Sequence, residues 1–177
     1  LLSLLTDLFK QAEQMTALFD IGITLTSGLD MEQVLKALLQ KCQQVLPVEA
    51  FYAVILDPDS GLIHHPLAYD MGEYLQIPSR DLRENPGLSG HVINTRQTLY
   101  IPDLLSPDAV KKIQVFRTSG TPTRSYVGVP MTVGDHVVGL ISMQSYQPNA
   151  YDRGQIRLLE TIAMQAAVAI ENSRLYA

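Results

Sequence analysis

The stretch from Thr123 to Tyr146 constrains the fold of this chain more than any other. Two runs rich in apolar residues flank Gly134-Asp135, which predicts two strands joined by a two-residue hairpin loop. Glycine at the first loop position suits a type II′ turn, because that position needs a positive φ. One face of the first strand is expected to carry Val127, Val129, Met131 and Val133.

The second strand of this hairpin is apolar on both faces. Strict alternation puts Val137, Ile141 and Met143 on one face and Val138 and Leu140 on the other. A strand that is apolar on both sides is usually covered on both sides, so we expect the hairpin in the middle of a sheet. Pro130 has no N–H for the ladder, which predicts a bulge or an unpaired side there.

Length and composition indicate one ordinary globular domain. The chain has 177 residues, with 46% hydrophobic and 18% charged. Its net charge of −5 and the lack of a basic stripe argue against nucleic acid or an anionic membrane surface as partner. The single cysteine, Cys42, precludes an internal disulfide and suits a reducing compartment, so we expect a cytoplasmic protein. We see no signal peptide and no apolar run of the ~20 residues that span a membrane.

Residues 1–27 form a predicted amphipathic helix. Its seam comprises Leu1, Leu4, Leu8, Met15, Leu18 and Gly22. Packing on one core would explain the part from Leu18 onward but not the apolar residues before it. We therefore predict a homodimer contact through Leu1, Leu4, Leu8 and Met15, together with Ile170 of the last helix.

The last predicted helix runs from Asp152 to Tyr176 and would be about 37 Å long, more than one small sheet can cover. We therefore expect a single domain over 1–177 in which 1–17 and 171–177 are helical extensions towards neighbouring domains. Because the chain begins without Met, we expect it to be a module of a longer protein.

The remaining segments complete an α+β pattern. We predict helices over 30–46, 86–95 and from 107, strands over 50–56, 62–69 and 98–101, and an irregular connection over 70–86. Cys42 lies on the apolar face of its helix and is predicted to be an inert core residue. His64 and His65 are adjacent, so on a strand they point to opposite faces, and we interpret both as polar surface residues. The N–H groups of 87–90 could hold an anion, although a plain glycine-rich turn is the simpler interpretation.

Five segments in this order resemble a GAF domain, and the resemblance covers nearly all of the chain. They are L-F-D-I-G-I-T-L-T-S-G-L-D at 18–30, P-G-L-S-G-H-V-I-N-T-R-Q-T-L-Y-I-P-D at 86–103, R-S-Y-V-G-V-P-M at 124–131, V-V-G-L-I-S-M at 137–143 and L-L-E-T-I-A-M-Q-A-A-V-A-I-E-N-S-R-L-Y at 158–176. The resemblance implies a central antiparallel sheet of five or six strands in the order 2-1-5-4-3. The first, second and last helices would cover one face, and loops with short helices the other.

GAF domains bind small molecules or dimerise inside signalling proteins, such as sensor histidine kinases and cyclic-dinucleotide enzymes. The family pocket lies between the sheet and the loop-helix face. By position, the resemblance puts near it Tyr74, Val92, Tyr100, Ile113, Phe116, Tyr126 and Ser142, with Arg124 as a positive charge for an anionic ligand. For all of these except Arg124, ordinary core packing is the alternative.

Departures from the family's patterns narrow the ligand without naming it. The loop-helix region lacks the cysteine that attaches bilin, and residues 119–125 lack the histidine that precedes this stretch in haem-binding members. The Asn-Lys…Phe…Asp-Glu motif of the cyclic-nucleotide-binding members is also missing. The sequence therefore argues against covalent bilin and against haem, and leaves the ligand unknown.

Three classes of function can be compared on these residues. A ligand-responsive regulatory module would pass its state through a helical dimer to an output domain, whereas a structural module would dimerise with a filled cavity. An enzyme is disfavoured: GAF-type methionine sulfoxide reductases use several cysteines, and no G-x-S-x-G elbow occurs. His91 and His136 show no metal-ligand spacing, so we predict no catalytic residue and no metal site.

Overall fold

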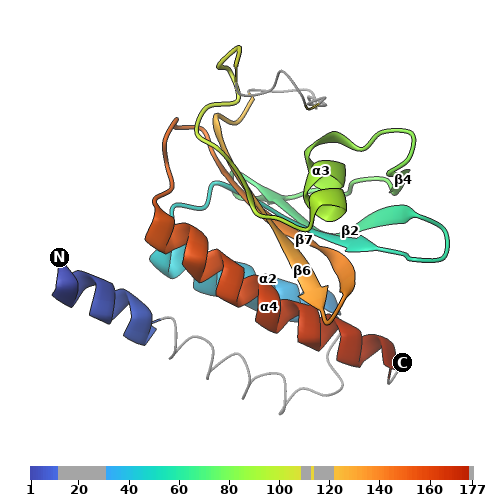
Figure 1. Ribbon diagram of the computed structural model, residues 1–177, viewed down its shortest axis with the longest axis horizontal. Helices are drawn as coiled ribbons and strands as arrows, with labels where there is room; N and C mark the ends of the chain where they lie inside the picture. Colours follow the sequence, from blue (N-terminus) through green and yellow to red (C-terminus); the bar gives the residue numbers. More distant parts are fainter. Residues whose placement is uncertain (12–30, 109–112, 114–121, 176–177) are drawn as a thin grey trace.

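The computed structural model describes residues 1–11, 31–108, 113 and 122–175 (Figure 1). Its helices are α2 (Met31–Val45), α3 (Gly87–Thr95) and α4 (Arg153–Leu175), and residues 2–11 are also helical. Its strands are β1 (Ala50–Leu56), β2 (Leu62–Asp70), β3 (Glu73–Tyr74), β4 (Arg80–Asp81), β5 (Leu99–Ile101), β6 (Ser125–Val133) and β7 (His136–Ser145). The rest of the predicted helix over 1–27, with Met15, and most of the helix predicted from 107, with Phe116, lie outside the described residues.

The strands form one antiparallel sheet in the order β3-β2-β1-β7-β6-β5, with β4 paired to β2. Its five principal strands follow the predicted order 2-1-5-4-3. The sheet gains two short strands, β3 and β4, from the connection that was predicted to be irregular. The predicted α+β fold is therefore confirmed, with a difference in strand count at the β2 side.

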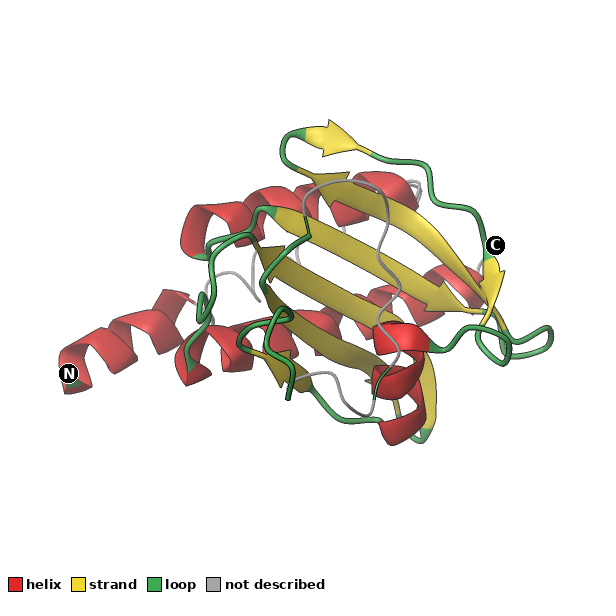
Figure 2. Cartoon of the chain, turned by 90° about the horizontal axis from the view of Figure 1, so that it is seen from above, coloured by secondary structure: helices red, strands yellow, loops and turns green. Residues whose placement is uncertain are grey.

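The two faces of the sheet are covered differently, as predicted. Helices α2 and α4 pack on one face, and α3 with the neighbouring loops lies over the other (Figures 1 and 2). The larger core lies between the sheet and α2 and α4. Its fully buried large side chains include Leu35, Leu39, Phe51, Met131, Ile141, Met143 and Leu159.

The central hairpin has the predicted loop. Val133 pairs with His136, which leaves Gly134-Asp135 as the two loop residues. Gly134 has a φ of +57°, whereas Asp135 is not among the residues with positive φ, as a type II′ turn requires. Local turn chemistry therefore sets the start of the register between β6 and β7.

The predicted bulge occurs close to Pro130, where the register shifts between Met131 and Thr132. Met131 pairs with Gly139 and Thr132 with Val137, so Val138 has no partner in β6. Beyond this extra residue the alternation is inverted. Val138 packs with Ile141 and Met143 on the helix face, and Val137 packs with Leu140 on the other. The predicted faces of the two valines were wrong, because strict alternation does not include a bulge.

The predicted dimer residues have different environments. Ile170 is only 3% exposed and belongs to the core, so the monomer itself buries it, and its prediction as an interface residue was wrong. The outward side of α4 instead exposes Met164 and Val168, at 63% and 49%. The helix turns its small residues to the sheet, and Ile170 lies on that same stripe.

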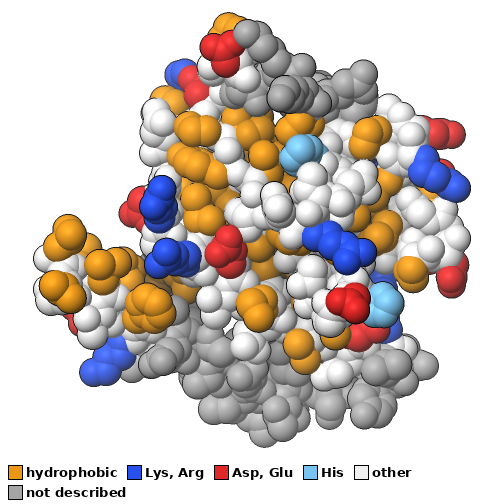
Figure 3. All heavy atoms as spheres, in the orientation of Figure 1, with side chains coloured by type: hydrophobic (Ala, Val, Ile, Leu, Met, Phe, Trp, Pro, Cys, Tyr) orange, Lys and Arg blue, Asp and Glu red, His pale blue; other side chains and the backbone are white. Residues whose placement is uncertain are grey.

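The N-terminal helical segment presents apolar side chains to solvent, where hydrophobic atoms gather at the lower left of Figure 3. Leu1 and Leu4 are exposed, as are Leu2, Leu5 and Phe9. Leu8 is half-buried and approaches the start of α4 at Gly154. None of the helices in the described ranges is both long and apolar enough to cross a membrane.

Gly139 provides a test of the central pairing. A Cβ at this position would lie 1.9 Å from the backbone oxygen of Val54, a contact that only backbone movement can relieve. We expect Gly139→Ala to lower the free energy of unfolding by about 1–3 kcal/mol, measured by urea denaturation. Gly134→Asn is the comparison variant: no atom lies within 4 Å of a Cβ there, so a loss at this position would reflect backbone strain at positive φ alone, which asparagine tolerates better than most residues. Equal losses in the two variants would contradict this account of β1–β7 packing.

Candidate functional site

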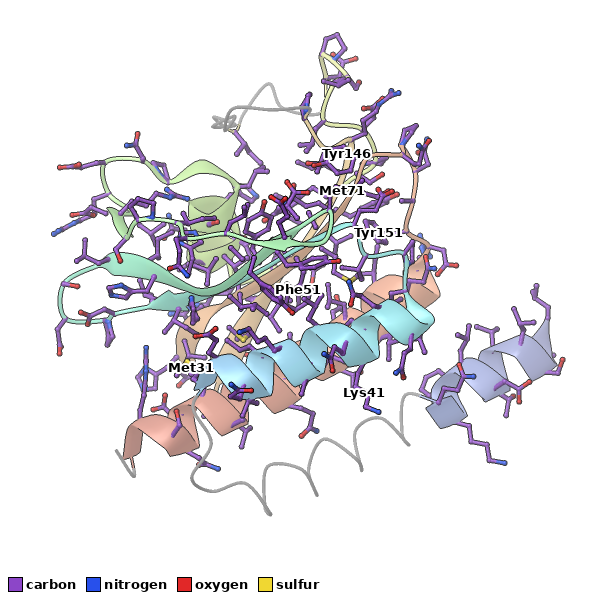
Figure 4. All side chains as sticks on the ribbon, turned by 180° about the vertical axis from the view of Figure 1, so that it is seen from behind. Met31, Lys41, Phe51, Met71, Tyr146 and Tyr151 are labelled. Atoms are coloured by element: carbon purple, nitrogen blue, oxygen red, sulfur yellow. The ribbon has the colours of Figure 1, made fainter. Side chains whose placement is uncertain are left out.

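A cavity of about 740 Å³ lies on the sheet face opposite α2 and α4. Figure 4 shows the two sides: Phe51 lies between the sheet and α2, whereas Tyr146 lies on the far side of the sheet. The floor of the cavity comprises Tyr52, Val54, His65, Asp70, Tyr126, Ser142, Gln144 and Tyr146. Its walls are residues 75–78, Arg80, Asn85, the first residues of α3, Leu104 and residues 122–123.

Tyr126 lies flat along the floor because Gly128 leaves room for it. The two residues are two apart on β6 and therefore share a face. A Cβ on Gly128 would lie 2.4 Å from the Tyr126 hydroxyl oxygen. The glycine thus allows the tyrosine ring to cover the sheet, and a side chain there would push the ring away.

Two buried polar atoms of the described residues have no hydrogen-bond partner, and both belong to residues that line the cavity. They are His65 Nδ1 and the Tyr126 hydroxyl oxygen. Leaving such a group unsatisfied typically costs about 1–3 kcal/mol. The free-energy cost of these unsatisfied groups therefore arises in the lining of the cavity, where a bound molecule could reduce it.

His65 is a cavity residue, so the prediction that it is a surface histidine was wrong. An irregular register between β1 and β2, between Ala53 and Ile55, accompanies its position. Burial, with a smaller effect from the charge of Arg80, lowers the pKa of His65 to about 4. The ring is therefore neutral near pH 7. His64 remains exposed as predicted, and its Nδ1 lies 2.6 Å from Ser79 Oγ.

Among the described residues of the cavity lining, Arg80 is the cationic side chain. Its guanidinium donates a hydrogen bond to the carbonyl oxygen of Asn85, and within the described ranges it forms no ion pair. Burial lowers the pKa of Arg80. A charge held partly out of water without a counter-ion is unfavourable. No local sequence pattern indicates this role, because it depends on the pairing of Arg80 with Ile63 across β4 and β2.

Asp70 is the anionic side chain of the cavity and ends β2. It accepts a hydrogen bond of 2.7 Å from the Tyr146 hydroxyl. Burial, followed by this bond to Asp70, raises the pKa of Tyr146 to about 12. Burial and then the charge of Asp70 also raise the pKa of Tyr52. Both phenols are therefore protonated hydrogen-bond donors near neutral pH.

The structure brings only some of the predicted ligand residues together. Tyr126 and Ser142 line the cavity. Val92, on α3, is fully buried in the apolar cluster between this helix and the sheet, and it is not part of the cavity lining. Tyr100 packs edge-on against Tyr151, with ring centroids 6.5 Å apart, on the helix side of the sheet. Its predicted place in the pocket was wrong, since its side chain takes the opposite face of the short strand β5.

Tyr74 and Ile113 also lie outside the cavity lining. Tyr74 is half-exposed on the edge strand β3, with its ring edge-on to Tyr69 and the Lys36 ammonium 4.9 Å from its centroid. Ile113 is half-buried, and Phe116 lies outside the described residues. The loop positions were the hardest to place by resemblance, because loops vary most between members of a fold.

Arg124 is paired with a neighbouring carboxylate. Its Nε lies 3.1 Å from Asp103 Oδ1 and its Nη2 bonds the other oxygen, a bidentate ion pair. The hydrogen bond from Arg124 lowers the pKa of Asp103. Neither residue lines the cavity, so the predicted role of Arg124 as the ligand's positive charge is not what the geometry favours.

The first turn of α3 faces the cavity. The helix begins at Gly87 as predicted, without a side-chain cap, and Gly87, Leu88 and Ser89 all line the cavity. The N-terminus of a helix carries a partial positive charge and free N–H groups. It therefore adds to the positive character of the wall that Arg80 forms.

In the described part of the chain, neither Cys42 nor a metal-binding group of side chains contributes to the cavity. Cys42 is fully buried in α2, on the other side of the sheet, as predicted for a core residue. Burial raises the pKa of its thiol to about 12, which keeps it protonated. Over the same residues, no three His, Cys, Asp or Glu side chains are grouped so that they could hold a metal ion.

The sequence profile of the GAF domain matches residues 28–171. The chain belongs to the GAF domain family. The cavity of this GAF domain lies where the resemblance implied, between the sheet and the loop-helix face. No curated protein shows significant sequence similarity to the chain.

Solved structures support the same fold at low identity. The GAF domain of an Acinetobacter phosphoenolpyruvate-protein phosphotransferase has a TM-score of 0.77 and 15% identity, over 96% of this chain and 95% of that one. A GAF domain of a Bacillus halodurans sensor histidine kinase has a TM-score of 0.64 and 17% identity, over 84% and 99%. The free methionine-R-sulfoxide reductase of Neisseria meningitidis, solved with its substrate, has a TM-score of 0.65 and 16% identity, over 92% and 94%. This GAF domain is thus similar in fold to GAF domains of a phosphotransferase and a sensor kinase and also to a reductase.

The depressed pKa of His65 predicts a pH dependence of stability. Above the ordinary histidine pKa of about 6.5 the ring is neutral in both states. As the pH falls towards 4, the unfolded chain takes up the proton before the folded protein does, so stability decreases across this window. With allowance for the partly exposed ring, we expect a loss of about 1–2 kcal/mol, measured by urea unfolding at several pH values.

His65→Gln should flatten this part of the pH profile. His64→Gln is the matched control, because the neighbouring ring is exposed and should leave the profile unchanged. A His65→Gln profile that still falls between pH 6.5 and 4 would assign the effect to other groups.

Proposed function

We propose that this GAF domain is a regulatory sensor that binds a small molecule in the cavity and passes its state to an output domain. GAF domains are regulatory sensor modules, and the family match covers most of the chain. The observation that carries the proposal is the polar part of the cavity lining, where, among the described residues, Arg80 has no ion pair and the buried polar atoms of His65 and Tyr126 have no hydrogen-bond partner. A cavity filled for structural reasons alone would more readily be lined by apolar side chains.

The proposed relay uses the terminal helices. Ligand binding would shift the population between two arrangements of a helix pair in a homodimer. Exposed apolar residues of the N-terminal helical segment, with Met164 and Val168 on α4, supply surface for such a contact. We further propose that residues 1–17 and 171–177 are extensions of a single domain and lead to neighbouring domains of a two-component or cyclic-dinucleotide signalling protein in the cytoplasm.

We propose no catalytic activity for this chain. One structural relative is a reductase of free methionine-R-sulfoxide, so the fold itself does not preclude catalysis. Thiol-based reduction proceeds through thiolate attack and a resolving thiol. The one cysteine of this chain is a buried, protonated thiol away from the cavity. We also propose that neither covalent bilin nor haem is the ligand, because the loop-helix region lacks a cysteine and residues 119–125 lack a histidine.

A second candidate is a ligand-free dimerisation and relay module. The observation that favours it is the row of exposed apolar residues on the N-terminal segment, of which Leu1 is 99% exposed. This candidate predicts a dimer whose cavity takes up no molecule. The two candidates therefore differ in ligand content and agree on assembly.

Mass spectrometry of the purified protein separates these candidates. We expect the native spectrum to carry a reproducible, stoichiometric extra mass that is released on denaturation, because the cavity wall offers unpaired polar groups. Gly128→Leu should lower the occupancy, since its side chain would drive the Tyr126 ring off the floor. Protein that shows no extra mass, and no thermal shift with any small molecule of a metabolite panel, would favour the ligand-free module.

The dimer contact can be tested by light scattering. We expect the joint change Met164→Glu and Val168→Glu to weaken self-association roughly tenfold or more, because two charges would be desolvated in the interface. Lys41→Glu on the exposed side of α2 is the control for a change of surface charge. Unchanged self-association of the α4 variant would exclude this side of α4 from the interface.

A further inference from the structure

The two charged side chains of the cavity come from distant points of its lining. Arg80 extends from β4, where it pairs with Ile63 near the start of β2. Asp70 is the last residue of β2. Asp70 follows Ile63 by seven residue steps along β2, which is about 23 Å of extended backbone. Arg80 and Asp70 are therefore attached at well-separated points of the described cavity lining, and they form no ion pair with each other.

Each of these charges has unused hydrogen-bonding capacity. Arg80 offers five N–H donors, and its recorded acceptor among the described residues is the Asn85 carbonyl. The carboxylate of Asp70 has one recorded donor there, the Tyr146 hydroxyl on Oδ1. Neither residue forms an ion pair with the other or with any other described residue. Each part of the cavity can thus accept a ligand group of opposite charge.

The surroundings of Arg80 strengthen its preference for an anion. The first turn of α3 lines the same cavity with its positive end. The charge of Arg80 acts on both His65 and Tyr126, so the three groups lie within electrostatic reach of one another. Among the described residues the buried hydroxyl of Tyr126 has no hydrogen-bond partner, and a protonated phenol is a donor. A carboxylate or phosphate would find several donors here.

The surroundings of Asp70 favour a donor and repel a second anion. Tyr52 and Tyr146 lie close enough for its negative charge to raise the pKa of both phenols. The rest of the lining offers apolar surface through Val54, Leu75, Ile77, Pro78, Leu88 and Leu104. A molecule that fits this cavity therefore has a neutral or apolar middle and ends of unlike character.

We propose that the ligand of this cavity is an elongated bipolar molecule, with an acidic group at Arg80 and a cationic or hydrogen-bond-donating group at Asp70. This inference rests on the proposed sensor function and specifies its ligand class. A simple α-amino acid does not satisfy it, because both of its charged groups are attached to one carbon atom and cannot reach Arg80 and Asp70 together.

Isothermal titration with a matched set of probes tests the inference. The probes are ω-aminooctanoate, octanoate, octylamine and glycine, with ω-aminooctyl phosphate to compare phosphate with carboxylate. We expect ω-aminooctanoate to bind about tenfold tighter than octanoate or octylamine, as one added charge-assisted hydrogen bond would give. Glycine should bind more weakly than all three. Tighter binding of the phosphate probe would identify phosphate as the acidic group, and weaker binding would identify carboxylate.

Variants of the charged residues make the test specific. Arg80→Gln should reduce the affinity for ω-aminooctanoate to that for octylamine, and Asp70→Asn should reduce it to that for octanoate. Arg80→Lys keeps the positive charge and should retain most of the preference for ω-aminooctanoate over octylamine. This variant shows whether a loss of affinity in Arg80→Gln reflects the loss of charge. Arg83→Gln is the matched control, because Arg83 lies in the same segment but pairs with Asp81 and does not line the cavity. Arg124→Gln should likewise leave the affinities unchanged.

Several outcomes would overturn the inference. They are equal affinities of Arg80→Gln and the parent protein, tightest binding by glycine, or no binding by any probe to a protein whose thermal unfolding is normal. The proposed function would survive these results if native mass spectrometry still showed a bound molecule of another class. Loss of both the bound molecule and all probe binding would overturn the two together.

Discussion

Strand β7 is the element on which the rest of the structure depends, because it is paired on both edges and buried on both faces. It lies between β1 and β6, and a Cβ at Gly139 would approach the Val54 oxygen to 1.9 Å. Its Ile141 and Met143 contact the helix side, and its Leu140 contacts the α3 side. Covering both faces forces the chain to supply two layers, of which the helix layer is a packed core and the other contains the cavity.

Buried polar contacts fasten the loops at one end of this sheet. Ser125 is fully buried, donates to the Gln147 carbonyl at 2.6 Å and accepts from the Ala150 N–H at 3.0 Å. The neighbouring Arg124 holds Asp103 in a bidentate pair, so the segment before β6 is tied to the loop after β5. These contacts explain why R-S-Y is a structural signature in this chain: arginine and serine secure the rim, and Tyr126 alone enters the cavity.

The rim and the cavity differ in how well their polar groups are satisfied. The rim residues Arg124 and Ser125 have ion-pair or hydrogen-bond partners, whereas within the described residues Arg80 lacks a counter-ion and His65 Nδ1 has no hydrogen bond. Local groups left unsatisfied in an otherwise consistent fold tend to mark functional positions. The stabilising contacts and the proposed ligand contacts thus belong to different residues, and the proposed sensing function rests on the unsatisfied group.

The sequence by itself determined the elements whose signals are local. Gly134-Asp135 defined the hairpin, Asp152 and Gln155 cap α4 by reciprocal hydrogen bonds of 2.8 and 2.9 Å, and periodicity identified Cys42 as a core residue. The order of the family-like segments then predicted the sheet order. Only the tertiary structure decided which side chains face the cavity. A bulge exchanged the faces of Val137 and Val138, and strand pairing placed Arg80 beside Ile63. An ion pair with Asp103 holds Arg124 outside the cavity. The physical reason is that register, bulges and ion pairs join residues far apart in the chain, and such long-range choices are settled by packing, which no local pattern records.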